Sequence, residues 1–196
     1  LIHGAGGGVG TAAIQLAQVA GGNIIGTSSG WKHEKLKNMG VNHCIDYNTE
    51  DVYQKVMKYT DNRGVDMIID PVGSKNWKIS YKCLAPMGKL VIFGDQNFVK
   101  GKSFNLLASL TEFLSMPKFR PMDLMSRNRS VMGYHLGRLS GVEYKIQLAA
   151  AELNKMAGAG KIKPVIDKVF PFTEADKAHA YIQARKNFGK VLLDFR

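Results

Sequence analysis

Five glycines stand among residues 4–10, in the run Gly-Ala-Gly-Gly-Gly-Val-Gly, between an apolar stub and a segment typical of a helix at residues 11–20. Glycine lets a phosphate approach the backbone, and the first turn of a helix offers N–H groups and the positive end of its dipole. A strand, a glycine turn and a helix in this order predict a dinucleotide site. Its expected contacts are Gly7, Gly8 and Val9 at the pyrophosphate, with Gly10 for close packing of helix on sheet.

The end of the second predicted strand distinguishes NAD from NADP. NAD sites usually place an Asp or Glu there for the ribose hydroxyls. Here the run from Gly26 to Lys32 contains no carboxylate, whereas Thr27 and Ser28 offer hydroxyls and Lys32 can neutralise a 2′-phosphate. The sequence therefore predicts an NADP(H) site, with Lys35 as a weaker candidate or a solvated surface residue.

Other candidate contacts follow the next strands, because ligands of such folds lie beyond the carboxyl ends of the strands. Tyr47 can cover the adenosine end of the cofactor, or it can be a core aromatic residue. Residues 70–73, with Val72 among them, and Phe93-Gly94 can fix the nicotinamide. Asp70 can also serve only as a helix N-cap.

Short β-rich runs alternate with helical runs along the chain, which predicts an α/β fold with a doubly wound parallel sheet. For strands counted along the chain, right-handed crossovers favour the order 3-2-1-4-5-6. Thr49 is the expected N-cap of one helix, and Thr173 opens a capping box of another. The predicted strands are residues 1–2, 23–27, 43–47, 65–69, 89–94 and 130–134, followed in the tail by 163–166 and 190–194.

Composition bounds the class of protein. The 196 residues are 45% hydrophobic, enough for a sizeable core, and no apolar run reaches the roughly 18 residues of a membrane span. Cys44 and Cys83 show no metal-binding spacing, and the five histidines show none either, so we predict no metal and a reducing, cytoplasmic location. The net charge of +11 fits a phosphorylated cofactor, an anionic membrane or a nucleic acid. No aromatic and basic arrangement indicates a nucleic-acid surface.

Residues 95–128 are too long for an ordinary connection between strands. Their apolar residues predict a helix near residues 104–114, and Pro117 and Pro121 interrupt the pattern. This helix either covers the last crossover or exposes an apolar patch to a partner subunit, a membrane or a substrate.

Several motifs together resemble the zeta-crystallin-like quinone oxidoreductases of the medium-chain dehydrogenase/reductase superfamily, and within them the vesicle amine transport protein branch. The resemblance covers essentially the whole chain. The motifs are residues 4–10, 26–27, 32–34, 40–41, 45–47, 70–73, 86–89, 133–137, 162–164 and 189–193.

The resemblance implies a cofactor domain at residues 1–163 and a C-terminal return at 164–196 to a GroES-like catalytic domain that precedes the glycine turn. It matches Lys32 and Tyr47 to positions that hold the 2′-phosphate, Phe93-Gly94 to the nicotinamide contact, and Phe188 to a tail loop over the cofactor. It implies zinc-independent hydride transfer from NADPH to a quinone or conjugated carbonyl, and a homodimer. The alternative is a non-catalytic, membrane-peripheral NADPH-binding protein. No residue of this chain is a convincing catalytic acid.

Overall fold

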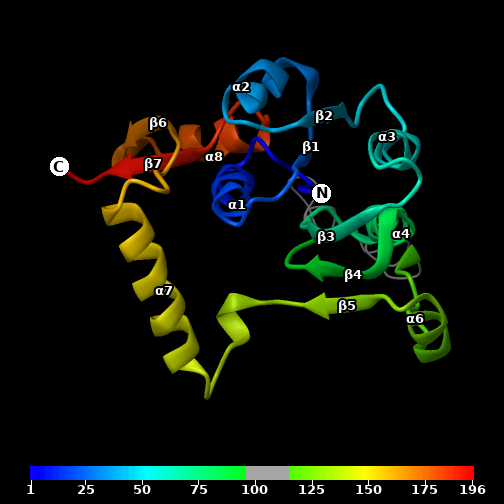
Figure 1. Cartoon of the computed structure of the whole chain (residues 1–196). Coiled ribbons are helices and arrows are strands. Elements are labelled where there is room, and N and C mark those ends of the chain that lie inside the picture. The colour runs from blue at the N-terminus through cyan, green and yellow to red at the C-terminus, as the bar shows by residue number, and fades with distance from the viewer. Residues whose placement is uncertain (96–114) are drawn as a thin grey trace. The chain divides into compact units, whose positions relative to one another are not determined.

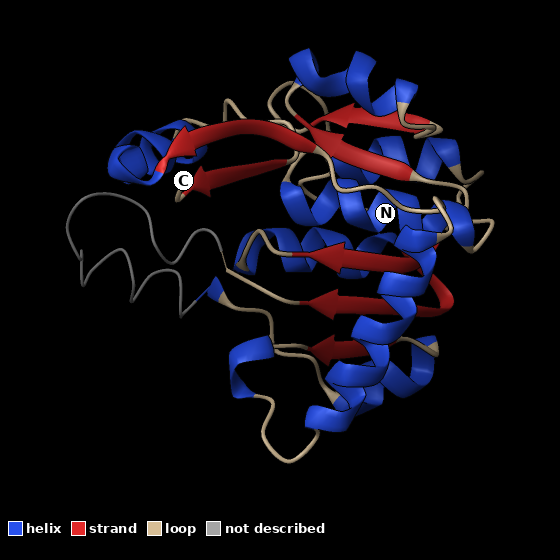
Figure 2. Cartoon of the chain, turned by 90° about the vertical axis from the view of Figure 1, so that its left-hand side faces the viewer, coloured by secondary structure: helices blue, strands red, loops and turns tan. Residues whose placement is uncertain are grey.

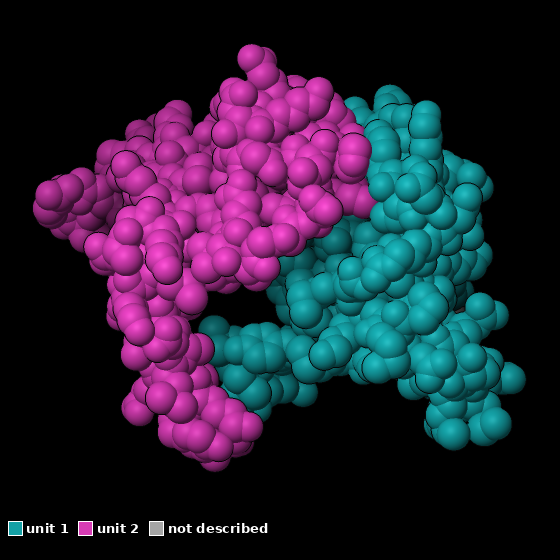
Figure 3. All heavy atoms as spheres, in the orientation of Figure 1, with its two compact units in different colours: residues 1–4, 45–139 teal, residues 5–44, 140–196 magenta. Residues whose placement is uncertain are grey.

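The computed structural model describes residues 1–95 and 115–196. The chain forms two compact units, which Figure 3 distinguishes by colour. One comprises Leu1–Gly4 and Ile45–Leu139, called unit 1 below. The other comprises Ala5–Cys44 and Ser140–Arg196, called unit 2.

Unit 1 contains three parallel strands in the order β3-β4-β5, which lie side by side in Figure 2. Ile2 forms an isolated parallel bridge with Ile69 on β3. The side chains of Val56, Ile68 and Leu90 are fully buried and form part of its core. The elements of this unit, labelled in Figure 1, are α3 (Val52–Tyr59), β3 (Val65–Asp70), α4 (Ser74–Cys83), β4 (Leu84–Ile92), α6 (Pro121–Arg127) and β5 (Ser130–Gly133).

Unit 2 holds the glycine run and the tail of the chain. Its strands β6 and β7 pair in parallel, and Ile14 and Leu36 are fully buried. Strand β2 (His43–Asp46) starts in this unit and pairs with β1. The other elements are α1 (Gly8–Val19), β1 (Ile25–Ser28), α2 (His33–Asn38), α7 (Glu143–Gly158), β6 (Ile166–Pro171), α8 (Ala175–Gln183) and β7 (Lys190–Asp194).

The predicted α/β class with parallel strands is confirmed, and most predicted elements form. The described strands fall into three groups, β1-β2, β3-β4-β5 and β6-β7. The order 3-2-1-4-5-6 requires one continuous sheet, so the full order stays a prediction, as does the domain boundary after residue 163. The helix expected near residues 104–114 lies outside the described residues.

Two expected helix caps are wrong. Helix α3 begins at Val52, where the carboxylate of Asp51 accepts the N–H of Gln54 at 2.9 Å, so Asp51 and not Thr49 is the N-cap. Helix α8 begins at Ala175 without a side-chain cap, and Thr173 belongs to the 3₁₀ turn before it.

One predicted strand starts later than expected. The strand expected at residues 163–166 starts only at Ile166, because the backbone of Lys163 is bonded to the side chain of Gln15. The N–H of Lys163 donates to Gln15 Oε1 at 2.6 Å, and its carbonyl accepts from Gln15 Nε2 at 2.9 Å. The predicted interruption at Pro117 and Pro121 agrees with the structure: residues 117–120 form no helix, and Pro121 opens α6 at its first turn, where proline's missing N–H costs nothing. No helix among residues 1–95 and 115–196 is long and apolar enough to cross a membrane.

Candidate functional site

The glycine run leads directly into helix α1, and no side chain caps the N-terminus of this helix. Gly7 is the N-cap with an extended backbone, φ −87° and ψ 174°, and Gly8 is the first helical residue. The helical hydrogen bonds start with Thr11 N–H, which donates to Gly7 O at 2.9 Å, so the N–H groups before it have no partner within the helix. No acidic side chain lies in this first turn. The local field there therefore favours an anion.

Two basic side chains lie directly against these glycines. A Cβ added at Gly6 would lie 2.6 Å from Cδ of Lys32, and one added at Gly8 would lie 2.6 Å from Cδ of Lys190. Such distances are far below ordinary contact. The exposed side chain of Lys190 can move aside, whereas Lys32 is buried and bound to Asn187, so Gly6 is the position where this packing requires glycine. The turn thus combines a helix N-terminus with two cationic side chains.

Lys32 is the most constrained of these cations. Its side chain is only 7% exposed, and its ammonium donates to the carbonyl of Asn187 at 2.5 Å. The ammonium also lies 5.0 Å from the centre of the Trp31 ring. Burial lowers the pKa of Lys32, and the charge of Asp167 opposes that shift in part. The side chain is therefore held in place rather than spread in solvent.

The tail loop formed by residues 187–189 lies against the glycine run. Gly189 N–H donates to Gly6 O at 3.0 Å, and Gly7 and Gly189 form a parallel bridge. Phe188 is buried, and its ring lies 5.4 Å from the ammonium of Lys35. Unit 2 thus brings together Lys32, Phe188 and the glycines, as the predicted site requires, although their roles in binding stay predictions.

Thr27 and Ser28 end strand β1 but lie below the surface. Both residues are buried, and Thr27 O accepts the N–H of Ala5 at 3.0 Å. The hydroxyl of Ser28 donates to the carbonyl of Ser29 at 3.0 Å. Their backbone therefore fixes the start of the glycine run, whereas a phosphate contact through their hydroxyls stays a prediction.

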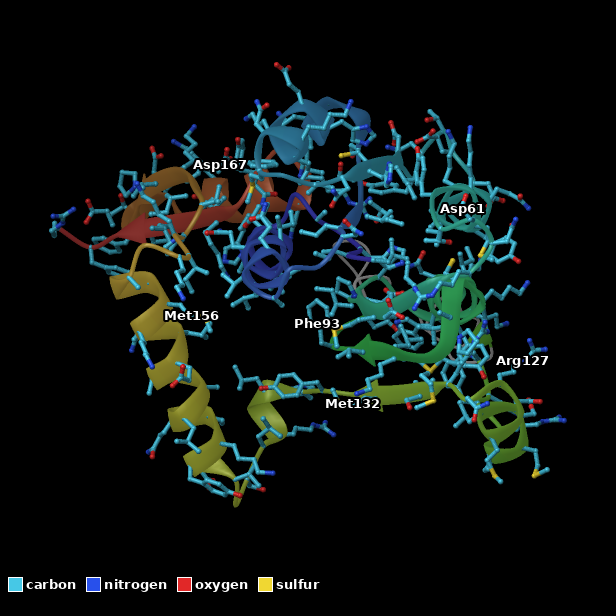
Figure 4. The ribbon with its side chains drawn as sticks, in the orientation of Figure 1. Asp61, Phe93, Arg127, Met132, Met156 and Asp167 are labelled. Atoms are coloured by element: carbon cyan, nitrogen blue, oxygen red, sulfur yellow. The ribbon has the colours of Figure 1, made fainter. Side chains whose placement is uncertain are left out.

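The remaining predicted contacts belong to unit 1. Phe93 N–H donates to Asp70 O at 3.3 Å, and Gly94 lies against Pro71, so the ends of β3 and β4 are adjacent. Figure 4 labels Phe93 beyond the end of β4. Val72 lies just after the end of β3, at the same edge of the strands. Tyr47 follows β2 and is 38% exposed. Val72, Phe93 and Gly94 thus come together at one edge of the three strands.

A buried polar network at that edge escapes the sequence analysis, which treats His3 and Asp70 separately and gives Ser80 no role. The Asp70 carboxylate accepts hydrogen bonds from the Ser80 hydroxyl at 2.6 Å, from the Asn76 amide at 2.7 Å and from Val72 N–H at 2.8 Å. Ser80 Oγ also lies 3.0 Å from His3 Nε2. The ring nitrogen therefore donates to the hydroxyl.

This network is not a hydrolytic triad, although it joins Ser, His and Asp. In a triad the imidazole stands between the nucleophile and the carboxylate. Here the hydroxyl of Ser80 stands in the middle and donates to Asp70. Burial lowers the pKa of His3 to about 4, against the attraction of Asp70, so the ring is neutral near pH 7. Among the described residues, no group of three potential metal ligands lies together.

A family model described as zinc-binding dehydrogenase matches residues 39–193. The chain belongs to this family. Within the medium-chain dehydrogenase/reductase superfamily it is quinone oxidoreductase-like. The family is named for zinc binding, and the independence of zinc expected for this chain stays a prediction.

Curated relatives match nearly the whole chain. The human synaptic vesicle membrane protein VAT-1 homolog is 40% identical over 194 residues, which cover 98% of this chain and 49% of the relative. A quinone oxidoreductase from Pseudomonas aeruginosa is 32% identical over 195 residues, 98% of this chain and 55% of its own length. The chain thus spans about half the length of the curated relatives it matches.

A solved structure agrees with these relatives. The Escherichia coli quinone oxidoreductase, whose structure is described as complexed with NADPH, has a TM-score of 0.77 and 26% identity. The match covers 98% of this chain and 56% of that enzyme's chain. The resemblance of the motifs to quinone oxidoreductases, and to the vesicle amine transport protein branch among them, is therefore confirmed.

Proposed function

We propose that this chain is the cofactor-binding part of an NADPH-dependent oxidoreductase of the quinone reductase type. The reaction is hydride transfer to a quinone or a conjugated carbonyl. The observation that carries the proposal is the pairing of the glycine turn with Lys32 in unit 2, where the ammonium group is held at the turn by the carbonyl of Asn187.

The donor set fits a pyrophosphate and a 2′-phosphate. The first turn of α1 carries no acidic side chain. Lys32 lies against Gly6, just before this helix, and Lys190 lies against Gly8, its first residue. An ammonium has three donors, of which Asn187 O takes one, so Lys32 can hold this carbonyl and a phosphate oxygen together. The run from Gly26 to Lys32, at the end of β1, contains no carboxylate to repel that phosphate.

The other predicted contacts complete the proposal. Phe188 covers the turn from the tail, and Tyr47 is assigned to the adenosine end. Val72, Phe93 and Gly94 are assigned to the nicotinamide. When bound, the cofactor supplies the hydride, and the chain supplies binding, orientation and charge. The solved relative named as complexed with NADPH supports this choice of cofactor. The quinone or enone substrate and the homodimer belong to the proposal for the whole protein.

The test removes the positive charge of Lys32 and keeps an apolar side chain of similar length. In the full-length protein, Lys32→Met should weaken NADPH binding about tenfold or more and leave NADH binding nearly unchanged, because a charge-assisted contact is worth about 1.5–3 kcal/mol. Lys37→Met is the matched control, since Lys37 is an exposed lysine on α2, the helix that directly follows Lys32. Calorimetric titration measures both cofactors.

Equal losses for NADH and NADPH in Lys32→Met would contradict the 2′-phosphate assignment. Tight NADPH binding by a wild-type protein that reduces no quinone or enone would favour the alternative, a non-catalytic NADPH-binding protein. Turnover of such substrates with NADPH supports the reductase.

A further inference from the structure

The residues after β3 are held by an unusually complete set of hydrogen bonds. Asp70 is fully buried, and its three donors come from two different places. Val72 N–H lies in the loop itself, whereas Asn76 and Ser80 lie on helix α4. The carboxylate therefore connects the loop at residues 71–73 to the body of the helix.

The network is anchored from a third side. His3, itself buried, contacts the Ser80 hydroxyl that donates to Asp70, and the backbone N–H of His3 donates to Ile69 O on β3 at 3.1 Å. A buried carboxyl group needs hydrogen-bond partners, and both oxygens of Asp70 accept from donors that the fold holds in place. It holds one backbone group, Val72 N–H, at a defined position.

That position is the edge of the sheet where the nicotinamide is assigned. Phe93 N–H is bound to the carbonyl of the same residue, Asp70, at 3.3 Å, and Gly94 lies against Pro71. Gly73, which closes the loop, has φ +132°, a conformation that L side chains rarely adopt. The loop is thus tied on both sides and has little freedom to adapt to a ligand.

We propose that Asp70 is a positioning residue for the nicotinamide half of the cofactor, because its buried network fixes the loop at residues 71–73 whose backbone meets that half. The inference rests on the proposed function. It assigns no role to Asp70 at the adenosine end or at the 2′-phosphate. The two halves of the cofactor can therefore be tested separately.

The experiment compares two ligands with the full-length protein, NADPH and 2′,5′-ADP, which carries the 2′-phosphate but no nicotinamide. Asp70→Ala should weaken NADPH binding about tenfold and change 2′,5′-ADP binding less than about twofold, because the loop loses a charge-assisted anchor. Asp70→Asn should bind NADPH with an affinity between those of wild type and Asp70→Ala, since its amide oxygen can still accept Val72 N–H whereas its NH₂ group cannot accept from Asn76 and Ser80. The control is Asp66→Ala, on the same strand, whose exposed carboxylate pairs with Arg63.

The outcomes separate the positioning role of Asp70 from the cofactor assignment. Equal losses for both ligands in Asp70→Ala, or no loss for NADPH, would overturn the positioning role while leaving the cofactor assignment intact. A wild-type protein that binds neither ligand would overturn the proposed function and this inference with it. If Asp70→Ala does not fold, Asn76→Ala removes one donor to the same carboxylate, and its NADPH affinity should fall by a smaller factor with 2′,5′-ADP unchanged.

Discussion

Gly6→Ala tests the packing of Lys32 on the glycine turn. The added Cβ would lie 2.6 Å from Lys32 Cδ and 3.4 Å from the Phe188 ring. Because carbon atoms in contact normally lie about 3.5–4.0 Å apart, the lysine stem must move by about 1 Å. It has little room, since its ammonium is held by Asn187 O and its side chain is almost fully buried. Overpacking of this kind costs about 1–3 kcal/mol.

The measurement is the free energy of unfolding from urea titration, with cofactor affinity as a second readout. Gly133→Ala is the matched control, because no atom lies within 4 Å of the Cβ that it adds. We expect Gly6→Ala to lose stability and part of its NADPH preference, and Gly133→Ala to stay within about 0.5 kcal/mol of wild type. Equal stabilities of the two variants, with the cofactor preference intact, would refute the reasoning.

Two further predictions concern buried titratable groups. The pKa of His3 is lowered from 6.5 to about 4 by burial, so between these values the unfolded chain binds the extra proton and stability falls with falling pH, by about 3 kcal/mol in total. His3→Gln should flatten this part of a urea-measured stability profile between pH 7 and 4, and an unchanged slope would contradict it. Burial also raises the pKa of the Cys83 thiol to about 12. Iodoacetamide at pH 8 should therefore alkylate the partly exposed Cys44 well before Cys83 in the native protein, as peptide mass spectrometry would show, whereas equal rates would disprove the burial of Cys83.

The sequence predicts those parts of the fold and site that local chemistry determines. The glycine run predicts the turn into α1, because few other residues allow such close approach. Strand β7 forms at the residues predicted for it, 190–194, since an apolar run follows a glycine there. The site residues Lys32 and Phe188 are named by a resemblance of motifs, and the structure adds the contacts that bring them to the turn.

Long-range contacts account for most of what the sequence misses. Gln15 bonds Lys163 across 148 positions and thereby delays the start of β6. His3 and Ser80 are 77 positions apart, so no spacing rule joins them into one network with Asp70. The bond from Lys32 to Asn187 spans 155 positions. Helix and strand periodicities reach only a few residues, so such pairings follow from the fold and not from local pattern.

Side-by-side calorimetric titration of the full-length wild-type protein with NADPH and NADH tests the central claim most directly. We predict a clear preference for NADPH, of about tenfold or more, because Lys32 is held at the turn and residues 26–32 contain no carboxylate. Equal affinity for the two cofactors, or tighter binding of NADH, would contradict it.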